Sequence, residues 1–214
     1  MSAAIRFSWP IASTTAVCLG QTGTAAFVIN GTLHDTARTS TGVFMAKFPG
    51  LQRTVSLTSA GNISAVDFTI VGTNLRGVAV TETRAGPNAN TVETTAEYHS
   101  VTSVTPSANV GTATSLGTGT TGSTNWIVHN TFAQNFQIAG QFDVTATLNY
   151  TVNYTDDDVQ TNTSPVSTVW GAGVSGATTD QVASILFPIR ASRVVINSSD
   201  ATGALTASFV QTGI

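Results

Sequence analysis

Charged residues are scarce in this chain. Asp, Glu, Lys and Arg together make up 9% of the 214 residues, whereas about 25% is usual for a soluble domain. Helix surfaces normally carry Glu, Lys and Arg, while the abundant Thr and Val of this sequence suit the pleated surface of a strand. The composition therefore argues against a helical protein. Two explanations of so neutral a surface stay open: partners cover much of it, or hydroxyl and amide groups keep it soluble.

Basic residues are too few and too dispersed to bind nucleic acid. The chain has eight Lys and Arg residues, which are scattered without forming a stripe, and its net charge is −3. Nucleic-acid binding depends on a concentrated positive surface, so we exclude that class of partner. The sequence also has no apolar run near the roughly 18 residues of a membrane helix, and we expect no membrane partner.

The chain contains a single cysteine, Cys18. A single thiol excludes an intrachain disulfide and a cysteine-based zinc site. The first ten residues lack the basic segment and apolar core of a secretion signal. We therefore expect the protein to be made and folded in a cytoplasm.

The strongest pattern lies between Phe142 and Tyr154, where apolar and polar residues alternate strictly for thirteen positions. A period of two is typical of a β-strand with one apolar and one polar face. Since the sequence offers no good helix to cover the apolar face, the cover must come from another sheet. We therefore predict an all-β chain of one or two antiparallel β-sandwich domains, of jelly-roll or immunoglobulin-like type.

Turn residues suggest how the chain divides. From Leu51 onward, short alternating segments are separated by Gly, Pro and Asn turns, as in antiparallel sandwiches. Residues 111–124 are rich in Gly and Thr, which fits either a flexible connection or a loosened edge strand with a loop; we place the domain boundary there. The predicted organisation is an extended N-terminal arm with opening strands at 1–50, a first sandwich at 51–122 and a second at 123–214.

Candidate catalytic and metal-binding residues are weak. The acidic run Asp156–Asp158 could contribute to a calcium loop, but successive carboxylates mostly diverge, and a solvated strand end that blocks edge pairing explains it better. His34, His99 and His129 are far apart in sequence, and no Gly-x-Ser-x-Gly motif frames a serine nucleophile. We predict no metal site and no catalytic triad.

Two of the carboxylates of Glu82, Glu93 and Glu97 could act together in glycoside hydrolysis if they converged in a cleft. Glu93 and Glu97 would share one face of a regular strand but stand about 13 Å apart, which is too wide for either standard geometry. We interpret all three as surface charges and predict no catalytic residue and no cofactor, so the chain is predicted not to be an enzyme.

The three tryptophans remain as contact residues, because an indole can stack on a sugar or anchor a partner subunit. Trp126 lies within an apolar Trp-Ile-Val run and is predicted to be core. Trp9, which precedes Pro10, and Trp170, which precedes a glycine, are predicted to form a subunit interface.

Turn and strand motifs recur along the chain from Leu51 onward. The clearest segments are Arg53–Ser64, Asp67–Gly77, Thr81–Thr83, Gly86–Ala89, Val101–Thr105, Trp126–Val128, Asn149–Val159, Phe187–Arg190, Arg193–Ile196 and Phe209–Gly213. Together these segments resemble a sequence type that is common in structural proteins of tailed bacteriophages. The resemblance covers roughly residues 51–214, and because its motifs are turns and strands it implies a fold and a virion origin and carries over no binding residue.

The resemblance implies a non-enzymatic virion protein that is assembled in a bacterial cytoplasm. We expect a capsid decoration or cement protein that forms homo-oligomers and contacts the major capsid protein or other virion proteins. An N-terminal arm, such as Met1–Gly23, would tie neighbouring subunits together. The alternatives are a tail or head–tail connector component, and a carbohydrate-binding adhesin that uses Trp9 or Trp170.

Overall fold

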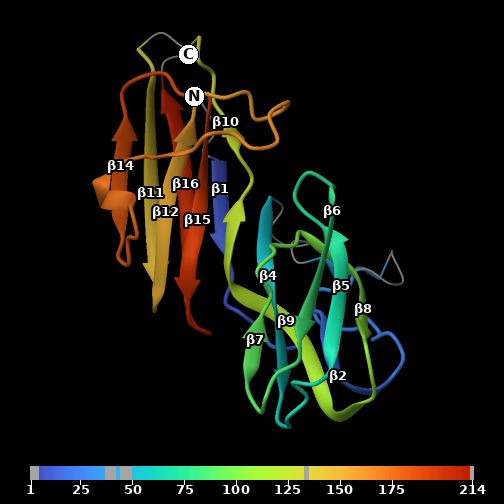
Figure 1. The fold of residues 1–214 in the computed structure, drawn as a ribbon. Helices are drawn as coiled ribbons and strands as arrows, with labels where there is room; N and C mark the ends of the chain where they lie inside the picture. Colours follow the sequence, from blue (N-terminus) through green and yellow to red (C-terminus); the bar gives the residue numbers. More distant parts are fainter. Residues whose placement is uncertain (1–4, 37–41, 44–49, 133–134, 213–214) are drawn as a thin grey trace. The chain divides into compact units, whose positions relative to one another are not determined.

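The computed structural model describes residues 5–36, 42–43, 50–132 and 135–212 (Figure 1). The prediction of an all-β chain is confirmed for these residues: the strands pair antiparallel, and one short 3-10 helix, η1, joins them. The elements are β1 (Ile5–Trp9), β2 (Cys18–Gly23), β3 (Gly42–Val43), β4 (Leu51–Ser59), β5 (Asp67–Thr73), β6 (Ala79–Ala85), β7 (Thr91–Glu93), β8 (Ser100–Pro106), β9 (Val110–Thr124), β10 (Ile127–Val128), β11 (Gln137–Thr145), β12 (Leu148–Thr155), β13 (Thr168–Val169), η1 (Ala172–Val174), β14 (Gln181–Ile185), β15 (Ala191–Ser199) and β16 (Ala204–Thr212).

The chain forms two compact units. Unit 2 is the continuous segment Ala12–Gly122, and unit 1 combines the chain up to Ile11 with the chain from Ser123 onward. This division differs from the predicted one: of the described residues among the first fifty, those up to Ile11 belong to unit 1 and those from Ala12 onward belong to unit 2. Most of strand β9 lies in unit 2, and its last two residues lie in unit 1.

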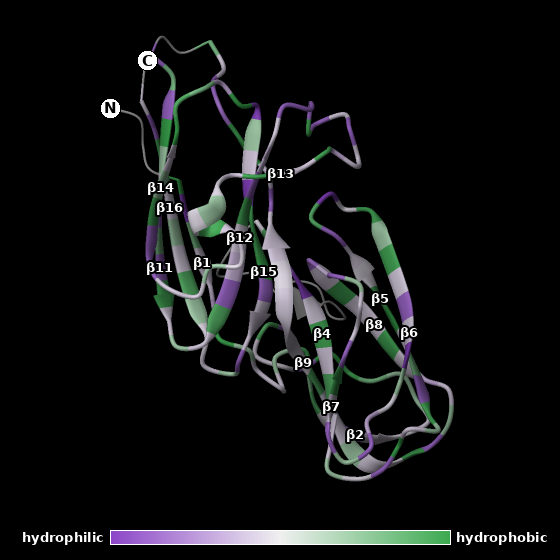
Figure 2. Cartoon of the chain, turned by 60° about the vertical axis from the view of Figure 1, so that its left-hand side comes forward, coloured by the Kyte–Doolittle hydropathy of each residue, from purple (hydrophilic) through white to green (hydrophobic). Residues whose placement is uncertain are grey.

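Unit 1 contains a four-stranded sheet in the order β1-β16-β11-β14. Hydrophobic and hydrophilic bands alternate along its strand β11 (Figure 2). The strand register determines which side chains lie on the same face of this sheet. One face carries the buried side chains of Trp9, Phe142 and Phe209. The other face is turned away from this core.

A second sheet of unit 1 has the order β13-β12-β15, with β10 paired to β15. Its buried face includes Tyr150, whose ring centroid lies 5.5 Å from that of Phe142 in the four-stranded sheet. Phe142 also meets Phe209 edge to face at 5.5 Å, and Trp170 packs on Phe209 at 5.7 Å. These aromatic contacts hold the core of unit 1.

The predicted single strand from Phe142 to Tyr154 is wrong in one respect. The chain leaves β11 after Thr145, turns at Ala146 with a φ of 58°, and begins β12 at Leu148 in the other sheet. A two-residue corner keeps the even-numbered positions in phase, so the apolar alternation continues unbroken while the backbone changes sheets. The pattern reports which side chains are buried, and the same core buries both halves.

The predicted N-terminal arm is also wrong for the residues described. Strand β1 pairs with β16 along its whole length, with Trp9 opposite Leu205. Strand β2 pairs with β9, although irregularly. Ile5, Phe7 and Trp9 occupy alternate positions on the side of the core, and five residues of alternation are enough for a strand when a neighbouring edge is open. Residues 1–4 of the proposed arm lie outside the described residues.

Unit 2 contains a sheet in the order β3-β8-β5-β6 and a group in the order β9-β4-β7, with β2 also paired to β9. Phe27 and Phe68 meet edge to face at 5.8 Å, and Phe68 and Tyr98 have no exposed surface. Strand β4 is buried on both faces over most of its length, as expected for an interior strand.

The Gly/Thr-rich segment is neither a flexible connection nor an edge. It forms the fifteen-residue strand β9, which has pairing partners on both sides, β4 and β2. The glycines of β9 let neighbouring segments of the chain lie close to its backbone. A Cβ at Gly117 would overlap the backbone carbonyl of Ser13, and a Cβ at Gly119 would overlap the hydroxyl of Thr54. Thr118 donates its N–H to the carbonyl of Ser13 at 2.9 Å in the same place. Small residues are therefore required here by packing.

Candidate binding pocket

Three segments of unit 1 meet where strands β10, β12 and β15 lie together. The N–H of His129, just after β10, donates to the carbonyl of Arg190 at 2.9 Å, and the N–H of Arg190 donates to the carbonyl of Thr155 at 3.1 Å. Ala191, the first residue of β15, pairs with both Val128 and Thr155. The backbone at this point is therefore fixed by regular strand pairing on both sides of β15.

A pocket of about 230 Å³ opens beside this junction. Its lining combines hydrogen-bond donors and acceptors with little apolar surface, since valines are its sole aliphatic residues. The lining residues are Val128, His129, Thr131, Asp157, Asp158, Val159, Gln160 and Arg190.

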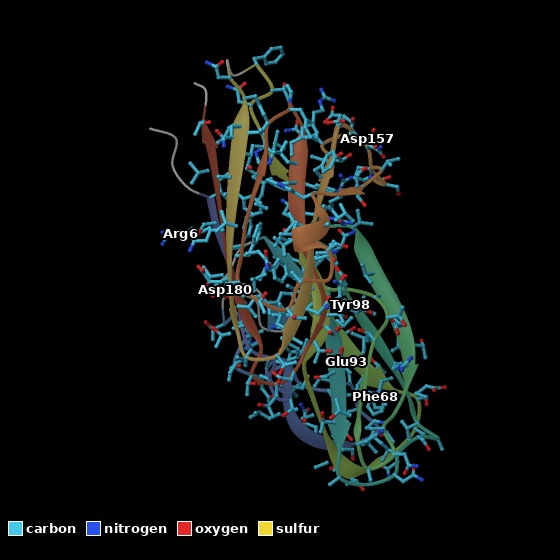
Figure 3. All side chains as sticks on the ribbon, turned by 90° about the vertical axis from the view of Figure 1, so that its left-hand side faces the viewer. Arg6, Phe68, Glu93, Tyr98, Asp157 and Asp180 are labelled. Carbon is cyan, nitrogen blue, oxygen red and sulfur yellow. The ribbon has the colours of Figure 1, made fainter. Side chains whose placement is uncertain are left out.

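Asp157 holds the loop that follows β12 (Figure 3). Its Oδ2 accepts hydrogen bonds from the N–H of Val166 at 2.7 Å and from the side-chain amide of Asn162 at 3.2 Å, while its own N–H donates to the hydroxyl of Thr155. Asp157 thus connects the beginning of this polar loop, next to Thr155, with its later part at Asn162 and Val166. The loop wall of the pocket is thereby ordered.

Asp158, like Asp157, is half-buried. Its Oδ1 accepts a hydrogen bond from the N–H of Gln160 at 3.0 Å. That hydrogen bond is the main reason that the pKa of Asp158 lies below its ordinary value, and the positive charge of Arg190 lowers the pKa further. The acidic run thus follows directly on the end of β12, and two of its carboxylates carry loop hydrogen bonds.

His129 and Ser192 form a buried pair next to the pocket. Nε2 of His129 lies 2.8 Å from the hydroxyl oxygen of Ser192, His129 is 8% exposed and Ser192 is 0% exposed. Burial lowers the pKa of His129 to about 4, so the imidazole is neutral at physiological pH. Sequence analysis missed this pair because the two residues are 63 positions apart.

This pair does not have the geometry of a catalytic dyad. A serine nucleophile needs a substrate within reach of its oxygen and a third group that orients the histidine. Ser192 has no exposed surface, and in the described part of the chain no hydrogen bond joins a carboxylate to His129. The contact serves to pack β15 against the segment after β10.

The three glutamates do not converge on a substrate site. Glu82 accepts hydrogen bonds from the N–H groups of Thr95 and Ala96, and Glu97 accepts one from the side-chain amide of Gln52. Glu93 accepts from the N–H of Thr120 at 3.0 Å and from a threonine hydroxyl at 2.9 Å. The carboxylates of Glu82 and Glu93 therefore accept hydrogen bonds from the backbone and stabilise turns and strands of unit 2.

Arg53 is a buried charge that sequence analysis overlooked. It is 0% exposed, and its guanidinium donates from Nε and Nη2 to the carbonyl of Gly119. Burial lowers the pKa of Arg53 to about 9, against the opposing influence of the Glu93 carboxylate. Arg53 and its hydrogen-bond partner Gly119 are enclosed within unit 2, and the guanidinium has a structural role.

The predicted interface residues lie in unit 1, and their side chains are largely enclosed. Trp9 is 2% exposed and Trp170 is 8% exposed, while Pro10 is half-buried. A partner subunit would reach little of either indole. A subunit interface at Trp9, Pro10 and Trp170 remains a prediction.

Trp126 was predicted to be core and is instead half-buried. The guanidinium carbon of Arg193 lies 4.6 Å from the centre of its ring. This is a cation–π contact at the surface of the β12-β15 sheet.

Within the described ranges, no group of three or more His, Cys, Asp or Glu residues is placed to hold a metal ion. No helix in this part of the chain has the length and apolar character needed to cross a membrane.

Comparisons with known proteins add little. No protein-family model matches the sequence. No curated protein sequence matches it. Among solved structures, the crystal structure of allantoicase from Saccharomyces cerevisiae aligns over 86% of this chain and 80% of its own, at 8% identity and a TM-score of 0.24. A likeness at this level carries no argument about fold or activity.

Proposed function

We propose that this chain is a non-enzymatic structural protein of a tailed-bacteriophage virion, and that it decorates and cements the capsid. In this proposal each unit is an antiparallel β-sandwich of the jelly-roll or immunoglobulin-like type. The chain forms homo-oligomers and binds the major capsid protein or other virion proteins. It is assembled in the host cytoplasm and requires no cofactor.

One observation carries the proposal: the outer face of the four-stranded sheet in unit 1 is almost neutral. We define this outer face by the residues that the strand register places opposite the core side. Arg6 and Asp143 are the charged residues among the fourteen, and Arg6 points away from the sheet (Figure 3). The outer face consists of Arg6, Ser8, Gln137, Ala139, Gln141, Asp143, Thr145, Val182, Ser184, Ala204, Thr206, Ser208, Val210 and Thr212.

Such a face is suited to contact with another protein. Charged groups are depleted from the centres of protein interfaces, because burying an unpaired charge is unfavourable. Val182 is 78% exposed and Val210 is 37% exposed in the isolated chain, so a partner that covers the outer face would remove apolar surface from water. Repeated contacts of this kind in a symmetric lattice suit a decoration protein.

The sandwich arrangement is supported by ring contacts between sheets. Phe142 belongs to the four-stranded sheet of unit 1 and Tyr150 to the other sheet, yet their rings are in contact. Two sheets that share one buried layer of side chains are the defining feature of a sandwich.

The enzymatic and adhesive alternatives have less support. The serine–histidine pair of unit 1 is closed to substrates, and the three glutamates of unit 2 do not form a cleft. An adhesin that uses Trp9 or Trp170 would need those indoles at the surface, and both are largely buried. A tail or connector position uses the same kind of neutral interface and differs from the capsid position in copy number.

The cementing role is tested with particles that lack this chain. The phage that encodes it should still assemble heads when the gene is deleted, but these heads should break at lower temperature or under osmotic shock. Adding the purified chain back should restore resistance. Deleted particles that resist heat and osmotic shock as well as the complete ones would contradict cementing.

A further inference from the structure

The pocket beside His129 is not needed to explain the fold or the decoration of a capsid. Its walls come from three segments that are already fixed by backbone pairing around Arg190 and by the hydrogen bonds of Asp157. We propose that this pocket binds one unit of a neutral, polyhydroxylated ligand: a sugar residue at the end of a glycan, or a free polyol. This binding activity goes beyond the proposed structural function and does not depend on it.

The charges of the lining restrict the chemistry of the ligand. An anion would meet the carboxylates of Asp157 and Asp158, and an organic cation would meet the guanidinium of Arg190. A bound metal ion is not favoured, since the described residues contain no cluster of ligands for one. An apolar ligand would leave these groups without water or partners, which is unfavourable.

Hydroxyl groups suit this mixture, because each of them can donate one hydrogen bond and accept others. The carboxylate of Asp158 can accept from a ligand hydroxyl, while the exposed side chains of Gln160 and Arg190 can donate to another. Nε2 of His129 is occupied by Ser192, so Nδ1 is the ring nitrogen left for a ligand. Val128 and Val159 offer small apolar patches for the C–H groups of a sugar ring.

The size of the pocket points to a single ring. Its volume of about 230 Å³ lies below the roughly 300–1,000 Å³ of pockets that take drug-sized ligands. A monosaccharide unit suits this volume, whereas an extended chain would have to lie mostly outside it. We therefore expect recognition of one terminal unit, with a dissociation constant of about 1 mM for a free monosaccharide.

The test uses the whole chain and defined probes. Saturation-transfer-difference NMR would be recorded with glucose, galactose, mannose, rhamnose, N-acetylglucosamine and glycerol, and a printed glycan array would be read in parallel. Two pocket variants, Arg190→Ala and Asp158→Asn, would be compared with two controls in unit 1 that lie outside the pocket, Arg6→Ala and Asp143→Asn. The dispersion of the amide NMR spectrum checks that every variant is folded.

The proposal predicts binding of at least one probe, weakened about tenfold or more by each pocket variant and unchanged in both controls. Binding on the array with the same variant pattern identifies a glycan terminus as the ligand, whereas binding of free probes alone identifies a small polyol. The proposal is overturned if no probe and no array glycan binds, or if the pocket variants bind as well as the controls. Binding of calcium chloride or inorganic phosphate at this pocket, with no sugar or polyol bound, also overturns it.

Discussion

Nε2 of His129 and the hydroxyl oxygen of Ser192 lie 2.8 Å apart in the interior of unit 1. A serine next to a histidine invites a catalytic interpretation, yet the serine is fully buried. The pair is instead a packing contact, and burial holds its imidazole neutral by lowering the pKa of His129. Burying the protonated imidazole is unfavourable, so this histidine affects the response of the protein to acid.

We predict that His129 makes the folded chain sensitive to mild acid. Burial lowers its folded pKa to about 4 from an ordinary value of 6.5. The unfolded chain therefore binds a proton between these pH values while the folded chain does not, and stability falls as the pH is lowered through this range. The pKa difference corresponds to about 3 kcal/mol. Urea unfolding at about pH 7 and about pH 4.5 measures the loss.

The matched variant is His129→Gln, which cannot take up a proton. It should be less stable than the natural chain near pH 7, because its contact with Ser192 is altered, but it should lose much less stability on acidification. Equal losses in the two proteins would show that His129 does not control this part of the pH response.

A second prediction concerns the glycines of strand β9. Gly117→Ala places a methyl group against the backbone carbonyl of Ser13, and a backbone atom cannot move aside cheaply. We expect a loss of about 2 kcal/mol or more in the free energy of unfolding, measured by urea titration.

Gly111→Ala in the same strand is the control, because a Cβ there meets nothing within 4 Å. It should be neutral or slightly stabilising, by up to about 1 kcal/mol. If both alanine variants are equally stable, residues 12–14 do not pack against β9 as described.

A third prediction tests the outer face of the four-stranded sheet. Val182→Lys puts a charge on an exposed position of β14, and Val78→Lys makes the same change at an exposed position of unit 2. Neither should alter the thermal midpoint of the isolated chain. If the outer face contacts the capsid, Val182→Lys should reduce binding to chain-depleted particles about tenfold or more, while Val78→Lys binds normally.

The outcome is measured by cosedimentation of purified chain with the particles. Loss of binding in the unit 2 variant alone would place the contact surface on unit 2. Unchanged binding by both variants would remove the outer face as the interface.

Alternation of apolar residues was sufficient to predict the class of fold. It could not reveal the corner at Ala146, because a two-residue turn preserves the phase of the alternation while the chain changes sheets. It also could not reveal β9, since glycine has no side chain with which to show a buried face. The requirement for Gly117 arises from the distant Ser13, and nothing near it in the sequence indicates that contact.

The pocket was beyond sequence analysis for a related reason. Its lining comes from residues 128–131, 157–160 and 190, which are brought together by pairing with β15. Each segment alone resembles an ordinary strand end or polar loop. The pairing of β1, which contains Trp9, could not be predicted because a short alternating segment near the start of a chain gives no sign of the edge with which it pairs.

The most direct test of the central claim is the copy number of this chain in purified phage particles, measured by quantitative mass spectrometry against the major capsid protein. A decoration protein that follows the symmetry of the shell predicts a ratio of about one to one or about one to three. A ratio on the order of one to thirty would move the chain to the tail or connector. Its absence from the particles would contradict the structural role altogether.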